Sequence, residues 1–239
     1  MLELALRNRI SIVKDGTYIY TRLSDKLVEL VDSSLTGEVL LDETIKLMKS
    51  SNEQLSINDW IDYMSGETWN LTKVNYQLKQ VRERLAKGLV DKGVLRTEKR
   101  SFFIFDMATH PVSDPVIKEE IVKRVCSSLL MKSDKVLVTS NLDRFDENFK
   151  PVLQLRTIAL ICSSYAANVL ENALWSMNLE EREKCFDKVE DYFRMFGVWP
   201  GNGSAKSLYE ACEGCGYTKG SLEVVASVLD VLSKMDSIL

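Results

Sequence analysis

Apolar residues recur at helical intervals along most of this chain, which predicts a mainly α fold. Side chains three and four residues apart share one face of a helix, so each such run predicts an amphipathic helix. Polar residues that cap helix N-termini precede several runs, among them Thr36, Ser56 and Asp114. The runs that predict amphipathic helices are residues 36–49, 56–66, 71–90, 114–132, 180–196 and 222–239.

One further run is apolar on nearly every side, as the central helix of a bundle is. It covers residues 151–175. The 11 Gly and 4 Pro are spread along the 239 residues, so no flexible linker divides the chain. We therefore expect a single domain over residues 1–239. Its predicted fold is a helical bundle around this central apolar helix, wrapped by the amphipathic helices, with a protruding β-hairpin.

Near the start of the chain, two short β-prone runs flank a turn signal. Residues 10–13 and 18–21 enclose Asp15-Gly16, a dipeptide that favours the positive φ angles of a tight turn. These residues predict a small hairpin. A short helix is expected after it, over residues 24–31, with Ser24 as its cap.

A second hairpin is predicted from residue 94 onward. Residues 94–97 and 101–105 form the two expected strands, and the charged residues 98–100 form the expected turn. The second strand carries four consecutive apolar residues at positions 102–105. Both of its faces then need cover from the domain, a partner chain or lipid.

The helix predicted over residues 71–90 combines an apolar stripe with basic flanks. Lys79 and Arg82 are three residues apart at the edge of the stripe, a spacing at which two cations on a helix can grip one anion. The six apolar residues expected on the buried stripe are Leu71, Val74, Leu78, Val81, Leu85 and Leu89.

Charge is concentrated in the same region. Residues 73–100 contain nine basic and three acidic residues, a local charge of +6 in a chain of net charge −4, which leaves −10 for the rest. A cationic face beside apolar residues suits an anionic membrane surface or phosphorylated headgroup better than a buried catalytic site. Charge alone is equally compatible with a solvated helix face, and it does not exclude nucleic acid.

No catalytic or metal site is indicated by the remaining candidates. His110 is the only histidine, and the Cys212/Cys215 pair has no second pair to complete a metal site. Residues 200–207 hold Lys-Ser but lack two glycines that a phosphate-binding P-loop needs. The odd count of five cysteines indicates a reducing compartment. The longest uncharged apolar run, residues 157–170, is shorter than the roughly 20 residues of a membrane-spanning helix, so membrane contact is expected to be peripheral.

Several longer motifs resemble the Golgi phosphoprotein 3 family, and the resemblance spans nearly the whole chain. It is strongest to fungal members, through LAKGLVDKGVLRTE at 85–98 and SKMDSIL at 233–239. The other motifs are EVLLDE at 38–43, SGETWN at 65–70, YQLKQVRERLAK at 76–87, FDMATHP at 105–111 and VLEN at 169–172.

The resemblance implies an adaptor and not an enzyme. It implies a peripheral protein on the cytoplasmic face of Golgi membranes that exchanges with the cytosol. Such a protein binds phosphatidylinositol 4-phosphate and the cytosolic tails of glycosyltransferases, which it links to coatomer so that retrograde transport retains them in the Golgi. It implies a homo-oligomer, with no cofactor and no nucleic-acid partner.

The resemblance also assigns roles to particular residues. Lys79 and Arg82 occupy the positions whose side chains bind the headgroup phosphates in the family. The family's hairpin contacts membrane and mediates self-association. Here it corresponds to Glu98, Lys99, Arg100, Ser101, Phe102, Phe103, Ile104, Phe105, Asp106, Met107, Ala108 and Thr109.

The chain departs from the family pattern at its start. The family's other two headgroup-binding residues, a Trp and an Arg, precede the motif that stands here at residues 3–7, and an arginine-rich coatomer-binding tail lies further upstream. We therefore expect weaker headgroup affinity than in longer relatives. The alternative is a structural or oligomerising protein that uses the hairpin for self-association without a complete lipid pocket.

Overall fold

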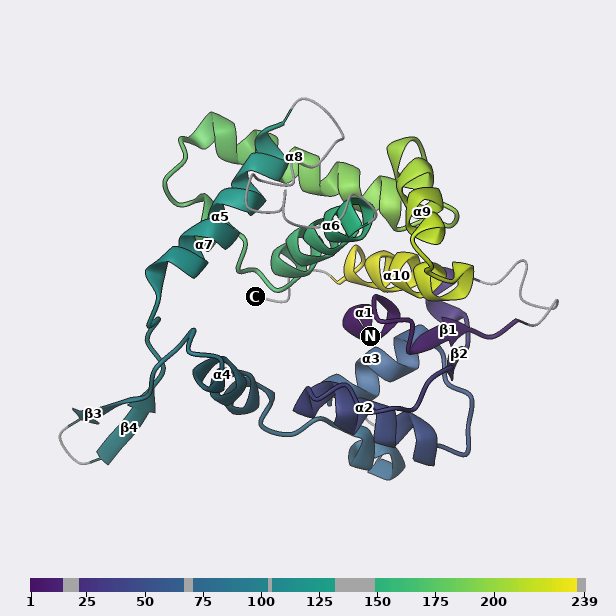
Figure 1. The fold of residues 1–239 in the computed structure, drawn as a ribbon, viewed down its shortest axis with the longest axis horizontal. Helices are drawn as coiled ribbons and strands as arrows, with labels where there is room; N and C mark the ends of the chain where they lie inside the picture. Colours follow the sequence, from purple (N-terminus) through teal and green to yellow (C-terminus); the bar gives the residue numbers. More distant parts are fainter. Residues whose placement is uncertain (15–21, 67–70, 103–104, 132–148, 236–239) are drawn as a thin grey trace.

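The computed structural model is a mainly helical bundle with two small antiparallel sheets, which confirms the predicted fold class (Figure 1). The structure describes residues 1–14, 22–66, 71–102, 105–131 and 149–235. In chain order the elements are α1 (Leu2–Ala5), β1 (Ile10–Ile12), the 3₁₀ turn η2 (Leu23–Asp25), β2 (Val28–Leu30), α2 (Val39–Ser50), α3 (Ile57–Ser65), the 3₁₀ turn η3 (Leu71–Tyr76), α4 (Val81–Asp91), β3 (Glu98–Phe102), β4 (Phe105–Thr109), α5 (Pro115–Leu130), α6 (Lys150–Ala166), α7 (Glu171–Leu174), α8 (Leu179–Phe196), α9 (Ser204–Gly214) and α10 (Lys219–Leu232).

Several helices begin and end where their capping residues predict. The Ser56 hydroxyl accepts a hydrogen bond from the Asp59 N–H, and the Asp59 carboxylate accepts one from the Ser56 N–H, which completes a capping box at the start of α3. Gly66 ends this helix with a φ of 86°, a left-handed conformation that glycine adopts without strain. Asp114 caps α5 as predicted.

Two helices share the centre of the bundle. Ten of the fourteen residues of α10 are buried, and this helix packs against α1, β1, α3, α6 and α8. The predicted central helix over residues 151–175 is only partly correct, because α6 ends at Ala166 and Asn168 adopts a φ of 53°. A left-handed residue cannot continue an α-helix. The rest of the predicted helix therefore forms the separate short helix α7.

The N-terminal sheet corrects another prediction. β1 pairs with β2 in an antiparallel register that sets Ile10 opposite Leu30. Residues 28–30 therefore form a strand where a helix over residues 24–31 was expected. The Val28 N–H also donates to the Leu55 carbonyl at 3.1 Å, so long-range backbone pairing overrides the local helical signal. The predicted strand at residues 18–21 and its turn at 15–16 lie outside the described residues.

The second hairpin stands apart from the helical bundle (Figure 1). β3 and β4 pair from Glu98 opposite Thr109 to Phe102 opposite Phe105. The expected turn at residues 98–100 is therefore wrong, because these residues lie in β3. A turn there leaves residues 106–109 without strand partners, whereas the observed register pairs five residues on each strand. The range 98–109 implied by the family resemblance matches the hairpin.

Candidate functional site

The segment that carries the predicted anion-binding cations is not one helix. It divides into η3 and α4, and between them Gln80 adopts a left-handed φ of 52°. The Leu78 N–H donates to the Met64 carbonyl at 3.1 Å, a bond to the end of α3 that a continuous helix cannot make. The predicted helix over residues 71–90 is therefore correct only from Val81 onward.

The first half, η3, packs against α3 and the segment before it. The Tyr76 ring lies edge-on to the Trp60 ring, with centroids 5.6 Å apart. Lys73 donates to the Glu53 carboxylate at 2.5 Å, and this hydrogen bond raises the pKa of the Lys73 ammonium. These contacts fix η3 against the N-terminal part of the bundle.

The predicted buried stripe does not form. Leu71 is 87% exposed and Leu85 is 53% exposed, and none of the residues of α4 is buried. The break at Gln80 changes the phase of the helical pattern, so Leu71 and Val74 no longer share a face with Leu85. α4 packs chiefly against α2 at the edge of the bundle.

Lys79 and Arg82 lie on either side of the start of α4, instead of along one helical flank as predicted. Lys79 precedes the helix, and Arg82 is in its first turn. Both side chains are exposed, and neither has a hydrogen bond or ion pair within the described ranges. The Arg84 guanidinium donates to the Lys79 carbonyl at 3.1 Å, which holds the backbone of Lys79 against the helix.

Within the described residues, no side chain caps the start of α4. The same is true of α2, α6 and α9, whereas α3, α5, α8 and α10 each have a capping side chain. The first N–H groups of a helix have no intrahelical acceptor and carry the positive end of the helix dipole. An anion at this position therefore meets backbone N–H donors and two cationic side chains together.

Other cations of the basic segment are already neutralised within the protein. Four of them form ion pairs, and the hydrogen bond from Lys92 lowers the pKa of the Glu38 carboxyl. The Arg84 pair links α4 to α2 and so fixes the helix whose start carries the candidate site. The four pairs are Lys73–Glu53, Arg84–Glu43, Lys92–Glu38 and Arg96–Glu98.

The sequence model of the family Golgi phosphoprotein 3 (GPP34) matches residues 1–208 of the chain. This chain belongs to that family. It is 49% identical to vacuolar protein sorting-associated protein 74 of Schizosaccharomyces pombe over 249 residues, covering all of this chain and 72% of the relative. It is 47% identical to the protein of the same name from Eremothecium gossypii over 252 residues, covering all of this chain and 74% of the relative.

Membership in the Golgi phosphoprotein 3 family supports a Golgi-associated trafficking role. The family and relative names point to sorting and not to catalysis. In the part of the chain that the structure describes, no helix has the length and apolar character needed to cross a membrane.

The hairpin of β3 and β4 follows the end of α4 after residues 92–97. The N–H groups of Val94 and Leu95 both donate to the Leu89 carbonyl, at 2.9 and 3.2 Å. The Arg96 N–H then donates to the Pro111 carbonyl at 2.9 Å, which extends the hairpin ladder toward its base. The candidate anion site and the hairpin are therefore carried by one continuous segment.

An apolar groove lies between α2 and α4. It encloses about 550 Å³, and Leu40, Leu41, Leu85 and Leu89 contribute apolar side chains to its lining. The Lys92–Glu38 ion pair stands at its rim. Leu85 and Leu89 of the predicted stripe therefore face this groove instead of a closed core.

The remaining sequence candidates lie apart from the start of α4. His110 is half-buried directly after β4, and its expected turn role stays a prediction. Cys212 is buried in α9 and Cys215 caps the same helix, with both thiols outside any disulfide. Among the described residues, no cluster of three or more His, Cys, Asp or Glu side chains is placed to hold a metal ion.

Sequence reasoning missed helix α9. Residues 204–207 were considered as part of a phosphate loop, but they form its first turn. The signal was present, because Ala205, Leu208, Tyr209 and Cys212 are spaced at three, four and seven residues, and all four are buried.

Proposed function

We propose that the chain is a peripheral adaptor on the cytoplasmic face of Golgi membranes that binds phosphatidylinositol 4-phosphate through Lys79 and Arg82. One observation carries the lipid part of the proposal. Lys79 and Arg82 flank an uncapped helix N-terminus and have no partner within the described part of the chain, while four nearby cations are paired.

The chemistry of a phosphorylated headgroup suits this arrangement. A monoester phosphate carries a charge of about −1.5 to −2 at neutral pH and offers three acceptor oxygens. Arg82 can donate two parallel hydrogen bonds, Lys79 adds a point charge, and the backbone N–H groups of α4 supply further donors. Each cation near an anionic membrane surface contributes about 1 kcal/mol.

The hairpin supplies a second contact in this proposal. Residues 98–102 and 105–109 stand away from the bundle and follow the end of α4, in the same segment whose first part carries Lys79 and Arg82 (Figure 1). We propose that this hairpin contacts the membrane and mediates self-association. Two weak membrane contacts, one to the headgroup and one through the hairpin, together anchor a peripheral protein better than either contact alone.

The cargo and coat parts of the proposal rest on family membership. In this view the bound adaptor links the cytosolic tails of glycosyltransferases to coatomer and so promotes their retention by retrograde transport. The names of the two relatives, which describe sorting-associated proteins, agree with such a role.

Liposome flotation tests the lipid site. Wild-type protein is expected to float with vesicles that contain phosphatidylinositol 4-phosphate and to float less with vesicles of equal charge made with phosphatidylserine. Lys79→Ala combined with Arg82→Ala should abolish that difference, and added salt should weaken binding. Equal flotation with both lipids, or an unchanged preference in the double variant, would contradict the proposal.

Lys87 provides the matched control. It is an exposed lysine of α4 with no ion pair in the described structure, but it lies beyond the first turn of the helix. Lys87→Ala should reduce binding to both vesicle types by the same small factor, because it removes only a general surface charge.

A further inference from the structure

A cavity of about 370 Å³ lies between α1, α5 and α6. Its volume is near the lower end of the roughly 300–1,000 Å³ typical of ligand sites. One face of α6 supplies much of the described lining, since Leu153, Arg156 and Leu160 are spaced at three, four and seven residues. The cavity therefore combines apolar and cationic side chains on the same helix face.

Arg124 of α5 lines this cavity without a counter-ion. Its side chain is half-buried, and its Nε is buried with no hydrogen-bond acceptor. In the part of the chain that the structure describes, its guanidinium forms no ion pair. A guanidinium offers five N–H donors, and buried donors in folded proteins nearly always have a partner. Arg124 therefore has unused donors at the wall of a cavity, where an anionic ligand can satisfy them.

Arg156 supplies a second guanidinium, which is already fixed in place. It donates to the Glu3 carboxylate at 2.6 Å and to the Leu6 carbonyl at 3.1 Å, and both bonds tie α6 to the N-terminal segment. The Glu3 carboxylate also accepts from Arg7 at 2.6 Å, and Glu3 is the one acidic residue among the described lining residues. Three guanidinium charges in and beside the cavity therefore stand against one carboxylate, which leaves a net charge of +2.

Leucine side chains supply the apolar part of the wall. Leu2 and Leu6 come from the N-terminal segment, and Leu153 and Leu160 come from α6. Leu6 is buried, whereas Leu160 is 38% exposed, so the apolar surface extends from the interior to the solvent. A ligand that fills this space needs an anionic group for the unpaired guanidinium and an aliphatic part for the leucines.

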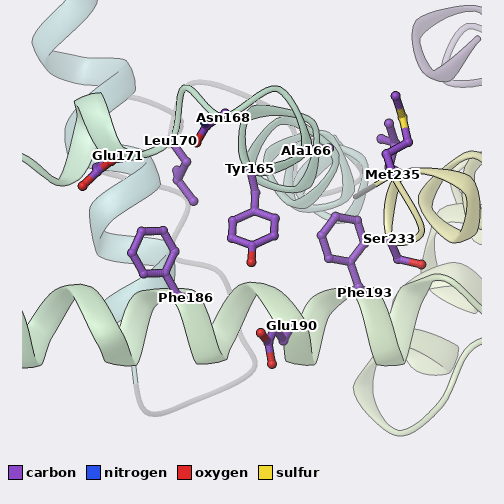
Figure 2. Close-up of a pocket in the computed structure, with 11 residues that line it drawn as sticks. Tyr165, Ala166, Asn168, Leu170, Glu171, Phe186, Glu190, Phe193, Ser233 and Met235 are labelled. Atoms are coloured by element: carbon purple, nitrogen blue, oxygen red, sulfur yellow. The ribbon is translucent and has the colours of Figure 1, made fainter. Parts of the chain in front are cut away.

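A larger cavity, between α6, α8 and the end of α10, has the opposite charge (Figure 2). Glu171 and Glu190 line it, and its described lining includes no Lys or Arg. Figure 2 shows Tyr165 between Phe186 and Phe193 at its centre. Carboxylates repel an anion from that cavity, whereas the excess of arginine attracts one to the cavity at Arg124. Charge therefore directs an aliphatic anion to the smaller of the two cavities.

From these observations we infer that the cavity at Arg124 binds an aliphatic monocarboxylate of the medium-chain fatty-acid class. The Arg124 guanidinium donates two parallel hydrogen bonds to the two carboxylate oxygens, a geometry that its planar fork favours. The aliphatic chain packs against Leu153 and Leu160. This site goes beyond the proposed function and is independent of the proposed lipid site at α4.

Other ligand classes match the cavity less well. A phosphate monoester carries a charge of about −1.5 to −2 and three acceptor oxygens, which one unpaired guanidinium does not satisfy. A neutral lipid leaves the Arg124 donors without an acceptor, and a small anion such as acetate leaves the leucine surface exposed to water. A fatty acid supplies one negative charge and one aliphatic chain together.

Isothermal titration calorimetry with octanoate tests the inference. Two control ligands each lack one half of the recognition: 1-octanol has the chain without the charge, and acetate has the charge without the chain. Wild-type protein should bind octanoate at least about tenfold more tightly than either control. Octanoate should also raise the melting temperature of the wild-type protein, because it binds the folded state.

Variants locate the binding. Arg124→Met should weaken octanoate binding at least about tenfold and leave octanol binding unchanged, because it removes the guanidinium but keeps a long side chain. Leu160→Ser should weaken octanoate binding and leave acetate binding unchanged. Lys123→Met is the matched control, since Lys123 is an exposed cation of α5 outside the described cavity lining, and octanoate binding should not change. Circular dichroism checks that each variant is folded.

The outcomes separate this inference from its alternatives. No binding of octanoate to wild-type protein, or equal binding by Arg124→Met, would overturn the inference. Tighter binding of octyl phosphate than of octanoate would indicate a phosphorylated lipid, and tighter binding of N-acetyl-leucine would indicate the C-terminus of a peptide, so either result would also overturn it. None of these results alters the flotation assay of Lys79 and Arg82, which tests the proposed function separately.

Discussion

The C-terminal core and the basic edge differ in whether their polar groups have hydrogen-bond partners within the protein. In the core formed by α6, α8, α9 and α10, two buried tyrosine hydroxyls find partners inside the protein: the Tyr192 hydroxyl donates to the Ser128 carbonyl at 3.0 Å, and the Tyr209 hydroxyl donates to the Phe196 carbonyl at 3.0 Å. In the basic edge, formed by residues 71–109, the Lys79 and Arg82 side chains and the start of α4 lack such partners in the described structure. The comparison indicates that stability is concentrated in the first region and binding capacity in the second.

Matched leucine truncations give the largest expected difference between the two regions. Leu229 in α10 is completely buried and Leu85 in α4 is 53% exposed. Leu229→Ala should lower the free energy of unfolding by about 2–5 kcal/mol, through lost apolar burial and a cavity. Leu85→Ala should lower it by no more than about 1 kcal/mol. Urea denaturation followed by circular dichroism measures both.

Both substitutions lie inside a helix, so the change in helix propensity is the same and cancels in the comparison. Similar losses for the two variants would mean that α4 is as deeply packed in solution as α10, and the contrast between the regions would fail.

Thiol reactivity gives the next largest effect. Burial raises the pKa of Cys162 and Cys212 from 9.0 to about 12. This lowers the thiolate population about a thousandfold at neutral pH, and the greater nucleophilicity of a more basic thiolate leaves a net rate reduction of roughly fiftyfold. With a maleimide, the half-buried Cys215 should react before Cys212, and mass spectrometry of peptides identifies the order.

Unfolding the protein in urea supplies the control, since all five cysteines should then react at similar rates. Rapid labelling of native Cys212 would show that α9 opens readily and does not belong to the stable core.

The sequence predicted the core better than the basic edge. Amphipathic periodicity placed α2, α3, α5, α8 and α10, because each of these helices packs a regular apolar face on the bundle. Side chains with a capping role, such as Ser56 and Asp114, marked helix starts, since the hydrogen bonds that define a cap are made within a few residues.

Features that depend on distant contacts were not predictable in this way. The strand at Val28–Leu30 requires its partner β1 and the Leu55 carbonyl, and the break at Gln80 accompanies the bond between Leu78 and Met64. A cavity of about 550 Å³ at Tyr165 assembles side chains from α6, α7, α8 and α10. Lys79 and Arg82 were identified as a pair from sequence, but their position around a helix start depends on the same break.

The smallest expected effect is a difference in the free energy of unfolding between substitutions at two helix starts. It tests the start of α4, which lies in the basic edge. Ser56→Ala removes the hydroxyl that accepts from the Asp59 N–H at 3.1 Å, so it should lower the free energy of unfolding by about 1 kcal/mol. Gln80→Ala should change it by less than about 0.5 kcal/mol, because the Gln80 side chain makes no capping hydrogen bond to α4. Urea denaturation again measures both.

The comparison of these two caps bears on the proposed lipid site. If Gln80→Ala costs as much as Ser56→Ala, the Gln80 side chain caps α4 in solution, and the N–H groups at its start are occupied before any phosphate arrives. If Gln80→Ala is neutral, those donors stay open, and a bound phosphate gains hydrogen bonds without displacing a protein acceptor. An uncapped start costs α4 some stability as an isolated helix, and the ion pair between Arg84 and Glu43 offsets part of that cost by holding the helix to α2.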